Sequence, residues 1–297
     1  AHWLRYSVEN NTTESKAYYL EYPVSNIHFL DVYVLQKGLV LQRYLTGGYK
    51  PLHNRALVYH SFLFPIMLEP GEKKEIYVRL KHLISSVSAN MILKEQTAFL
   101  LDDYAENVLE GVFFGVMIAM FFYNLILYMM TRFKPYIAYI LYLGSFGTWL
   151  SLRMGYGQYL FDFMSVEIYR YFELTISMLF TVFIIWFING VLELKKALPK
   201  AYIFLNIMSA LFVVSWSMIC LLMLLEIEGY FKYPSNLFFI NFLVMNISIA
   251  VASMILAIRG NRTAFYILTA WMLFLSSMVI LMLSKTGVCL LYTSPSP

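Results

Sequence analysis

The pattern of hydrophobic and polar positions divides the chain into two parts of different character. From about residue 109 onward, long apolar stretches free of charge alternate with short polar connections. An α-helix needs roughly 20 apolar residues to cross a hydrocarbon core about 30 Å thick. The pattern therefore predicts six membrane-spanning helices, at about residues 109–131, 135–153, 172–192, 201–225, 235–258 and 263–284.

Residues 1–105 instead contain short segments rich in Val, Ile, Tyr and Phe, separated by turn-forming residues. Within 76–80 every second residue is aliphatic, as in a half-buried strand, whereas 27–35 is apolar on both faces, as in a central strand. The spacing is typical of an all-β sandwich with a jelly-roll-like fold. The seven predicted strands are 3–8, 17–22, 27–36, 39–44, 57–64, 76–80 and 90–94.

The distribution of Lys and Arg over the connections predicts the orientation in the membrane. Connections after the first, third and fifth predicted spans carry seven Lys and Arg residues, whereas those after the second and fourth carry three. Positively charged connections stay in the cytoplasm. We therefore expect an extracytoplasmic β domain over 1–105 and a transmembrane helical bundle over 106–285. No long linker separates the two, which suits mechanical coupling between them.

Composition excludes several classes of protein. Hydrophobic residues make up 60% of the chain and charged residues only 13%, which excludes a disordered chain and a simple soluble domain. Residues 1–108 hold 11 basic and 11 acidic side chains, so the net charge of +4 lies entirely in the apolar part. It is not the dense basic face that a nucleic-acid partner requires. Two cysteines exclude a disulfide framework and a cysteine-rich zinc cluster.

The sequence contains no motif for catalysis or for cofactor binding. We find no nucleophile elbow, Walker loop, glycine-rich dinucleotide turn or zinc-protease motif. The five histidines lack the spacing of metal ligands, so we expect no metal and no cofactor. The predicted spans carry no deep ionisable residue, which argues against an ion-coupled transporter. We therefore expect that this chain is not itself an enzyme.

Several segments, taken in order, resemble the bacterial seven-transmembrane receptors with diverse intracellular signalling modules (7TMR-DISM). In the membrane part the similar segments are 110–116 (EGVFFGV), 136–142 (YIAYILY), 155–160 (GYGQYL) and 259–264 (RGNRTA). In the N-terminal part, 3–5 (WLR), 70–72 (PGE) and 77–79 (YVR) are similar to the family's type-2 extracellular domain, a jelly roll like those of carbohydrate-binding modules. The resemblance covers about residues 1–285.

The resemblance implies a sensory receptor in the bacterial inner membrane. Its β domain would bind a small ligand, for example a carbohydrate, and would signal to a cytoplasmic output module. The family has seven spans and an output module such as a histidine kinase or a diguanylate cyclase, so we expect the seventh span and that module to be missing here. A homodimer is implied by the resemblance alone. Two alternatives stay open: a transporter or exporter subunit with a substrate-binding β domain, and an envelope anchor.

Both ends of the sequence look incomplete. The chain begins at Ala1 and shows no signal peptide, although an exported domain needs one, so we expect the native start to be missing. Residues 289–297 resemble translated sequencing-adapter read-through, and we expect them to be a non-native tail.

Three groups of residues are candidates for a functional role. The side chains in and near one glycine-rich loop that could stack on a sugar and hydrogen-bond to it are Tyr44, Tyr49, His53 and Arg55. The polar residues of the outer connections that could pass the state of the β domain to the helices are Arg153, Gln158, Asp162 and Arg170. The amides expected to join helices within the membrane are Asn124, Asn241 and Asn246. The competing interpretations are a packed loop rim for the first group, a solvated loop for the second, and a relay role for the third.

Overall fold

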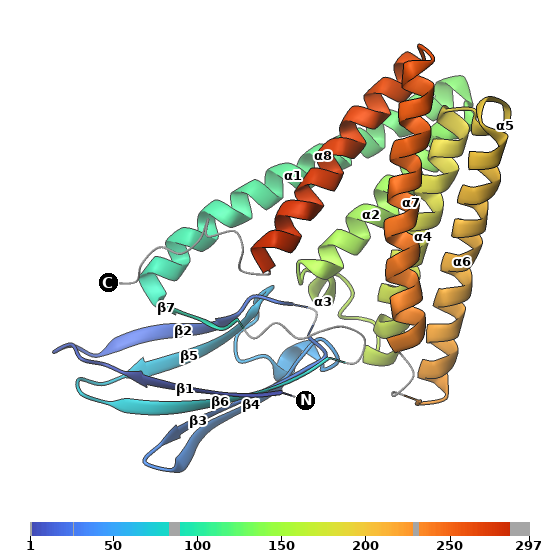
Figure 1. Cartoon of the computed structure of the whole chain (residues 1–297). Helices are drawn as coiled ribbons and strands as arrows, with labels where there is room; N and C mark the ends of the chain where they lie inside the picture. Colours follow the sequence, from blue (N-terminus) through green and yellow to red (C-terminus); the bar gives the residue numbers. More distant parts are fainter. Residues whose placement is uncertain (1, 26, 83–89, 228–231, 286–297) are drawn as a thin grey trace.

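The computed structural model describes residues 2–25, 27–82, 90–227 and 232–285 of the chain. A β domain made from the N-terminal residues lies beside one end of a bundle of long helices (Figure 1). The division into a β part and a helical part is therefore confirmed. The expected non-native tail at 289–297 lies outside the described residues.

The β domain consists of two antiparallel sheets. One sheet has the strand order β1-β6-β3-β4, and the other has the order β5-β2-β7. Its strands are β1 (His2–Glu9), β2 (Lys16–Tyr22), β3 (Phe29–Gln36), β4 (Leu39–Thr46), β5 (Phe62–Leu68), β6 (Lys73–Lys81) and β7 (Ile92–Glu95). A short 3-10 helix, η1 (Leu52–Asn54), lies in the connection between β4 and β5.

A single apolar core joins the two sheets. On β6, Ile76, Val78 and Leu80 are fully buried, and the side chains between them point to the outer face. The half-buried strand predicted for this segment is therefore confirmed. Tyr22 on β2 and Phe64 on β5 fill the same core from the opposite sheet. Because burial of each large apolar side chain stabilises a fold by about 1.5–3 kcal/mol, the shared core fixes how the sheets pack.

All seven predicted strands are present, and β3 lies inside its sheet between β6 and β4, as predicted. The fifth strand is displaced from its predicted position at 57–64, because β5 runs from Phe62 to Leu68. Pro65 lies in its middle, and a proline cannot donate a hydrogen bond to a neighbouring strand. It is tolerated because β5 is at the edge of its sheet and, among the described residues, pairs with β2 alone.

In the part of the chain that the structure describes, six long helices follow the β domain: α1 (Gln96–Thr131), α2 (Lys134–Arg153), α4 (Val166–Val191), α6 (Pro199–Leu224), α7 (Lys232–Ile258) and α8 (Arg262–Lys285). Two one-turn helices, α3 (Gly157–Leu160) and α5 (Leu194–Ala197), lie in the connections. Among the described residues, α1, α4, α6 and α7 are long and apolar enough to cross a membrane. The helix α1 begins at Gln96, directly after β7 ends at Glu95, so the predicted absence of a linker is confirmed.

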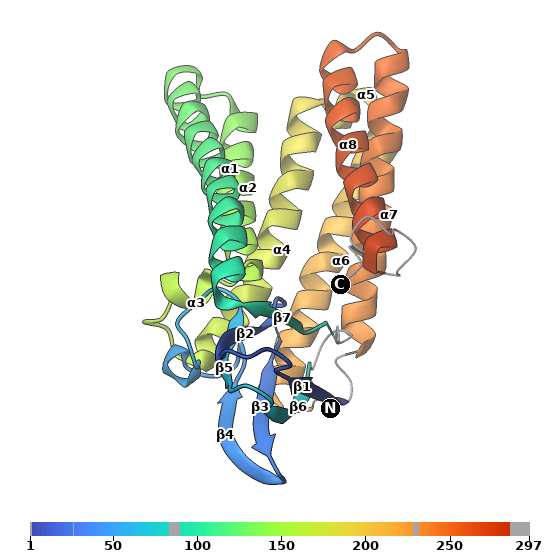
Figure 2. The same ribbon diagram turned by 90° about the vertical axis from the view of Figure 1, so that its left-hand side faces the viewer.

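The long helices pack in chain order, each against the next (Figure 2). The α1–α2 turn, α5 and the α7–α8 turn lie at the end of the bundle far from the β domain, and α3 lies at the near end (Figure 1). The seven basic residues of the first, third and fifth connections therefore gather at the far end. This arrangement agrees with the prediction that the basic connections and the β domain lie on opposite sides of the membrane.

The three candidate amides within the helices differ in their partners. Asn241 on α7 donates a hydrogen bond to the main-chain oxygen of Met208 on α6, at 2.9 Å, and so joins two helices. The main-chain oxygen of Asn246 accepts a hydrogen bond from Trp271 of α8, at 3.1 Å. The side-chain amides of Asn246 and Asn124 donate to main-chain oxygens of their own helices.

We predict that Asn241→Leu lowers the stability of the bundle by about 0.6–1.7 kcal/mol, the range for hydrogen bonds between membrane helices. The measurement is the unfolding midpoint in mixed detergent micelles. The matched control is Asn206→Leu, because Asn206 is exposed on α6 and its amide donates only to Tyr202 of the same helix. An equal loss in both variants would contradict a specific role for the α6–α7 hydrogen bond.

Candidate functional site at the junction of the two parts

The β domain meets the helices at a junction formed by the 47–61 segment, the first turns of α1, the α2–α3 turn and the start of α4. The junction depends on a close approach of two backbones. Gly155, in the α2–α3 turn, has φ +91°, and a Cβ atom added there would lie 2.0 Å from the main-chain oxygen of His60. It would also lie 2.7 Å from Oγ of Ser25. Only glycine fits this position, both for its conformation and for the space available.

Arg55 is the buried cation of the junction. Its guanidinium donates to the main-chain oxygens of Tyr59, His60 and Ser61, and to the side-chain oxygen of Gln158 in α3. The guanidinium carbon also lies 4.4 Å from the ring centroid of Phe62. Burial lowers the pKa of Arg55 below its ordinary value, yet a guanidinium stays protonated in proteins. The charge is therefore held by neutral oxygens and ring faces.

Gln158 connects the helical part to two places in the β domain. Its oxygen accepts from Arg55, and its nitrogen donates to the main-chain oxygen of Gly48, at 2.8 Å. The Gly48 loop is itself held to the start of β3, because Gly48 N–H donates to the oxygen of Ile27 at 2.7 Å. One side-chain amide on α3 therefore contacts the 47–61 segment at two points, Gly48 and Arg55.

Tyr49 lies between a histidine of the β domain and an arginine of the bundle. Its ring stacks on His28 with centroids 3.9 Å apart, and the guanidinium carbon of Arg170 on α4 lies 4.3 Å from its centroid. Cation–π contacts of this kind contribute about 0.5–2 kcal/mol, more when they are desolvated. His28 also stacks on His82, at 3.9 Å. Burial, followed by the interaction with His82 and by the charge of Arg170, lowers the pKa of His28 to about 2, so the imidazole is neutral.

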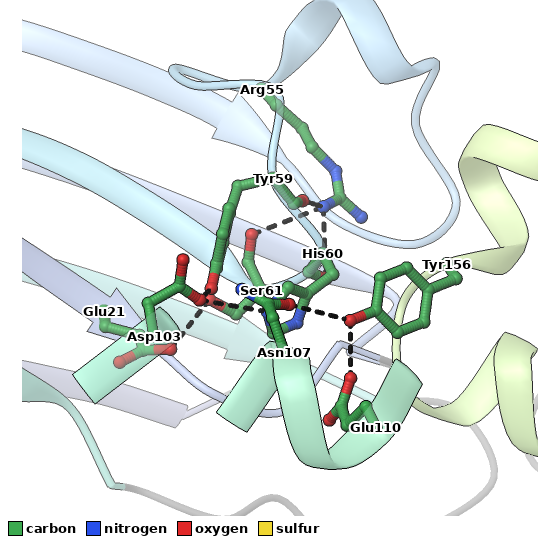
Figure 3. A network of polar contacts seen from close by, with 9 residues as sticks. All are labelled: Glu21, Arg55, Tyr59, His60, Ser61, Asp103, Asn107, Glu110 and Tyr156. Atoms are coloured by element: carbon green, nitrogen blue, oxygen red, sulfur yellow. Dashed lines mark hydrogen bonds and ion pairs between the residues drawn. The ribbon is translucent and has the colours of Figure 1, made fainter. Parts of the chain in front are cut away.

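A second polar cluster joins the loop before β5 to the first turns of α1 (Figure 3). Tyr59 donates to the carboxylate of Asp103, and Ser61 donates to Glu21 at 2.8 Å. From the α2–α3 turn, Tyr156 donates to Glu110 of α1. Burial, reinforced by the Glu110 carboxylate, raises the pKa of Tyr156, so its hydroxyl stays protonated and remains a donor.

The junction encloses a cavity of only about 10 Å³, enough for a single water molecule at most. Its lining includes His28, Tyr49, Arg55, Gln158 and Glu173. The junction is therefore a packed contact between two parts of the chain. Among the described residues, no group of three His, Cys, Asp or Glu side chains converges as a metal site would require.

The structure brings together some of the predicted site residues and separates others. Tyr49 and Arg55 both line the junction, but Tyr44 on β4 packs against Phe64 at the core, with ring centroids 5.3 Å apart, and His53 is exposed on η1. The side chains from the first candidate group therefore do not form one loop site.

Two of the four predicted coupling residues, Gln158 and Arg170, contact the β domain. Arg153 lies over Trp149 of its own helix, 5.9 Å from the centroid, and Asp162 is exposed. Sequence reasoning missed His28, His60 and Gly155. The available signal for Gly155 was the repeated glycine of the GYGQYL segment, which marks a tight turn.

Comparisons with known proteins give two matches that follow one another along the chain. Residues 1–93 match the domain family described as 7TMR-DISM extracellular 2, and residues 106–296 match the family described as 7TM diverse intracellular signalling. No curated protein and no solved structure matches the chain. The junction described above is therefore a contact in space between the two matched regions, with Gly48 and Tyr49 in the first and Gln158 and Arg170 in the second.

We predict that Gly155→Ala weakens docking of the β domain on the helices, because the added Cβ atom collides with the main chain of His60. Hydrogen exchange of the full chain in lipid nanodiscs should increase at 57–61 and at 152–160. The matched control is Gly260→Ala, since Gly260 has nearly the same φ, +87°, with no atom within 4 Å of the added Cβ. That variant should show only the strain of about 1–2 kcal/mol in its own turn. Unchanged exchange at the junction in Gly155→Ala would show that the contact tolerates displacement.

We predict that the junction loses stability as the pH falls below about 6.5. Unfolded His28 takes up a proton near pH 6.5, whereas the buried imidazole, with its pKa lowered to about 2, does not. The unfolded state therefore binds more protons in this window, and the free energy of opening decreases by up to about 1.4 kcal/mol per pH unit. Above pH 6.5 this contribution is constant.

The measurement is the free energy of local opening at 47–50, from hydrogen exchange corrected for intrinsic rates between pH 7.5 and 5.5. His28→Phe keeps an aromatic ring against Tyr49 and should reduce the slope. His53→Phe removes an exposed histidine and should leave the slope as in the unmodified chain. Equal slopes in the unmodified chain and in His28→Phe would refute the assignment to His28.

Proposed function

This chain belongs to the 7TMR-DISM family of membrane signalling receptors, and on that premise we propose that the β domain binds a small ligand and passes the signal through the junction to the helices. It is a multi-pass membrane protein with an extracellular N-terminal domain. We further propose that it lies in a bacterial inner membrane and carries six of the family's seven spans, α2 and α8 included. The signal would then reach a cytoplasmic output module.

The observation that carries this proposal is the direct mechanical contact between the two parts. Strand β7 continues into α1 without an intervening residue, and β7 pairs with β2 within the three-stranded sheet. A shift of this sheet would therefore tilt or rotate α1. A tethered anchor would need no such connection.

The junction supplies a second route that does not use the covalent connection. Gln158 and Arg170 lie on α3 and α4, and each contacts the segment of the β domain that contains Gly48 and Tyr49. We propose that Tyr49 and Arg55 serve this route, with Gln158 and Arg170 as their partners. A ligand that favours one position of the 47–61 segment would thereby favour one packing of α1, α2 and α4.

A sugar panel tests this proposal on the full chain in lipid nanodiscs. The panel holds neutral and acidic mono- and disaccharides, and hydrogen exchange is read separately in the β domain and at 152–160. At least one sugar should alter exchange in both regions. A panel in which every sugar leaves 152–160 unchanged would contradict the relay through the junction.

We predict that Gln158→Ala uncouples the two responses. The substitution removes the side-chain oxygen that accepts from the buried Arg55 and the side-chain nitrogen that donates to the main-chain oxygen of Gly48. We expect the free energy of docking between the β domain and the helices to become less favourable by about 1–3 kcal/mol. A sugar that binds the unmodified chain should still protect the β domain, but the change at 152–160 should be lost. The matched control is Gln42→Ala, an exposed glutamine on β4, which should respond like the unmodified chain. Full coupling in Gln158→Ala would exclude this amide from the relay.

A further inference from the structure

The outer face of the four-stranded sheet carries a groove of about 340 Å³. It is lined from β3, β4, β6 and the loop after β4 by Phe29, Tyr33, Arg43, Lys50, Arg79 and Lys81, together with Asp31 and Leu45. Ligand pockets for small molecules usually enclose about 300–1,000 Å³, so this groove suits a ligand the size of a mono- or disaccharide. The three-stranded sheet lies between the four-stranded sheet and α1 (Figure 1).

The alternation of β3 creates this face. Leu30, Val32 and Val34 fill the core, so Phe29, Asp31 and Tyr33 point outward. Cross-strand pairing then sets Arg43 opposite Tyr33, Arg79 opposite Asp31 and Lys81 opposite Phe29. Cations and aromatic rings thus alternate across neighbouring strands as a consequence of register.

The charge of the groove is strongly one-sided, with four cationic side chains and a single carboxylate. That carboxylate, Asp31, forms an ion pair with Arg79 at 2.9 Å. Arg43 lies over the ring of Tyr33 at 5.6 Å, and Lys50 lies over Phe29 at 5.9 Å. Among the described residues, neither Arg43 nor Lys50 forms an ion pair. Both can therefore receive an anionic group without first losing an acidic partner.

The aromatic rings indicate what else the ligand must carry. The ring of Trp3 on β1 lies 6.1 Å from that of Tyr33 and is 59% exposed, which extends the apolar surface beside the groove. Aromatic faces pack against the apolar face of a ring compound, and guanidinium and ammonium groups bind carboxylates. The geometry combines both requirements within one groove.

We propose that this groove binds a small acidic ring compound, and, resting on the proposed receptor function, that its natural ligand is an acidic sugar of the uronate type. The carboxylate lies between Arg43 and Lys50, and the sugar ring packs beside Phe29 and Tyr33. The groove adjoins the junction directly. Phe29 contacts Tyr49 with ring centroids 6.1 Å apart, and Lys50 follows Tyr49 in the chain.

The loop at 47–50 therefore belongs to both sites. Gly47 has φ +136°, and a Cβ atom there would lie 2.3 Å from the main-chain oxygen of His28, so the loop is held tightly against the start of β3. When the ligand draws Lys50 away from Phe29, the displacement is transmitted to Tyr49 and Gly48. These are the residues that Arg170 and Gln158 contact.

The test compares digalacturonic acid with its methyl ester, which keeps the rings and removes the negative charges. Binding to the full chain in nanodiscs is measured by titration calorimetry at low and at high salt. We expect the acid to bind at least tenfold more tightly than the ester at low salt, and expect this preference to shrink at high salt. Arg43→Ala and Lys50→Ala should each weaken binding of the acid about tenfold or more.

The matched control is Arg5→Ala. Arg5 lies on the same sheet but outside the groove, where it is paired with Glu75 at 2.8 Å. Its removal should leave the affinity unchanged. Equal binding of acid and ester, no binding of the acid, or full affinity in both Arg43→Ala and Lys50→Ala would overturn the proposed ligand class.

Hydrogen exchange at 152–160, measured in the same samples, separates this proposal from the receptor function. Binding of the acid without a change at 152–160 would support the groove and count against the relay. A change at 152–160 caused by the ester as strongly as by the acid would count against the acidic ligand and support the relay.

Discussion

The close approach of two backbones, at Gly155 and His60, is the constraint on which the junction depends. The guanidinium of Arg55 reaches Gln158 only because the α2–α3 turn lies directly against the loop that precedes β5. A side chain at position 155 would separate these segments, and Arg55 would then remain buried without the acceptor on α3. Arg55 would keep its main-chain acceptors in the 59–61 loop, so the loss would be that of one hydrogen bond to a buried charge, about 1–3 kcal/mol.

The core of the β domain and its junction with the helices are built from different kinds of interaction. Its own core is apolar and built from large side chains such as Tyr22 and Phe64, so the two sheets have one well-defined packing. The junction is instead made of hydrogen bonds and ring contacts around Arg55 and Tyr49, each with a net contribution of about 0.5–3 kcal/mol. A rigid domain on a polar contact of this kind is suited to two alternative positions, because the contact can rearrange while the core does not.

The fold could be predicted from the sequence further than the site could. Strand periodicity and long apolar stretches depend on neighbouring residues, so all seven strands and the long helices were predicted. Their bounds were predicted less well, because α1 begins at Gln96 rather than near 109 and β5 extends past Pro65 to Leu68. The junction depends on contacts between residues more than 90 positions apart, such as Arg55 and Gln158. Such contacts cannot be predicted from the pattern of neighbouring residues. Tyr44 and His53 were grouped with Tyr49 because they are near it in sequence, but strand alternation turns Tyr44 towards the core and η1 exposes His53.

The loop at 47–50 is the segment shared by the groove and the junction, so the free energy of coupling between them depends on this loop. A ligand can shift the position of the β domain only by the difference in its affinity for the two positions, and each tenfold difference corresponds to about 1.4 kcal/mol. Contacts to β3, β4 and β6 alone would bind equally well in both positions, since these strands belong to one rigid sheet. Lys50 is the groove cation whose place depends on the loop that Gln158 and Arg170 contact. Under the proposed receptor function, affinity could therefore reside in the whole groove, whereas the signal would come from the part of the binding energy that depends on Lys50 and its loop.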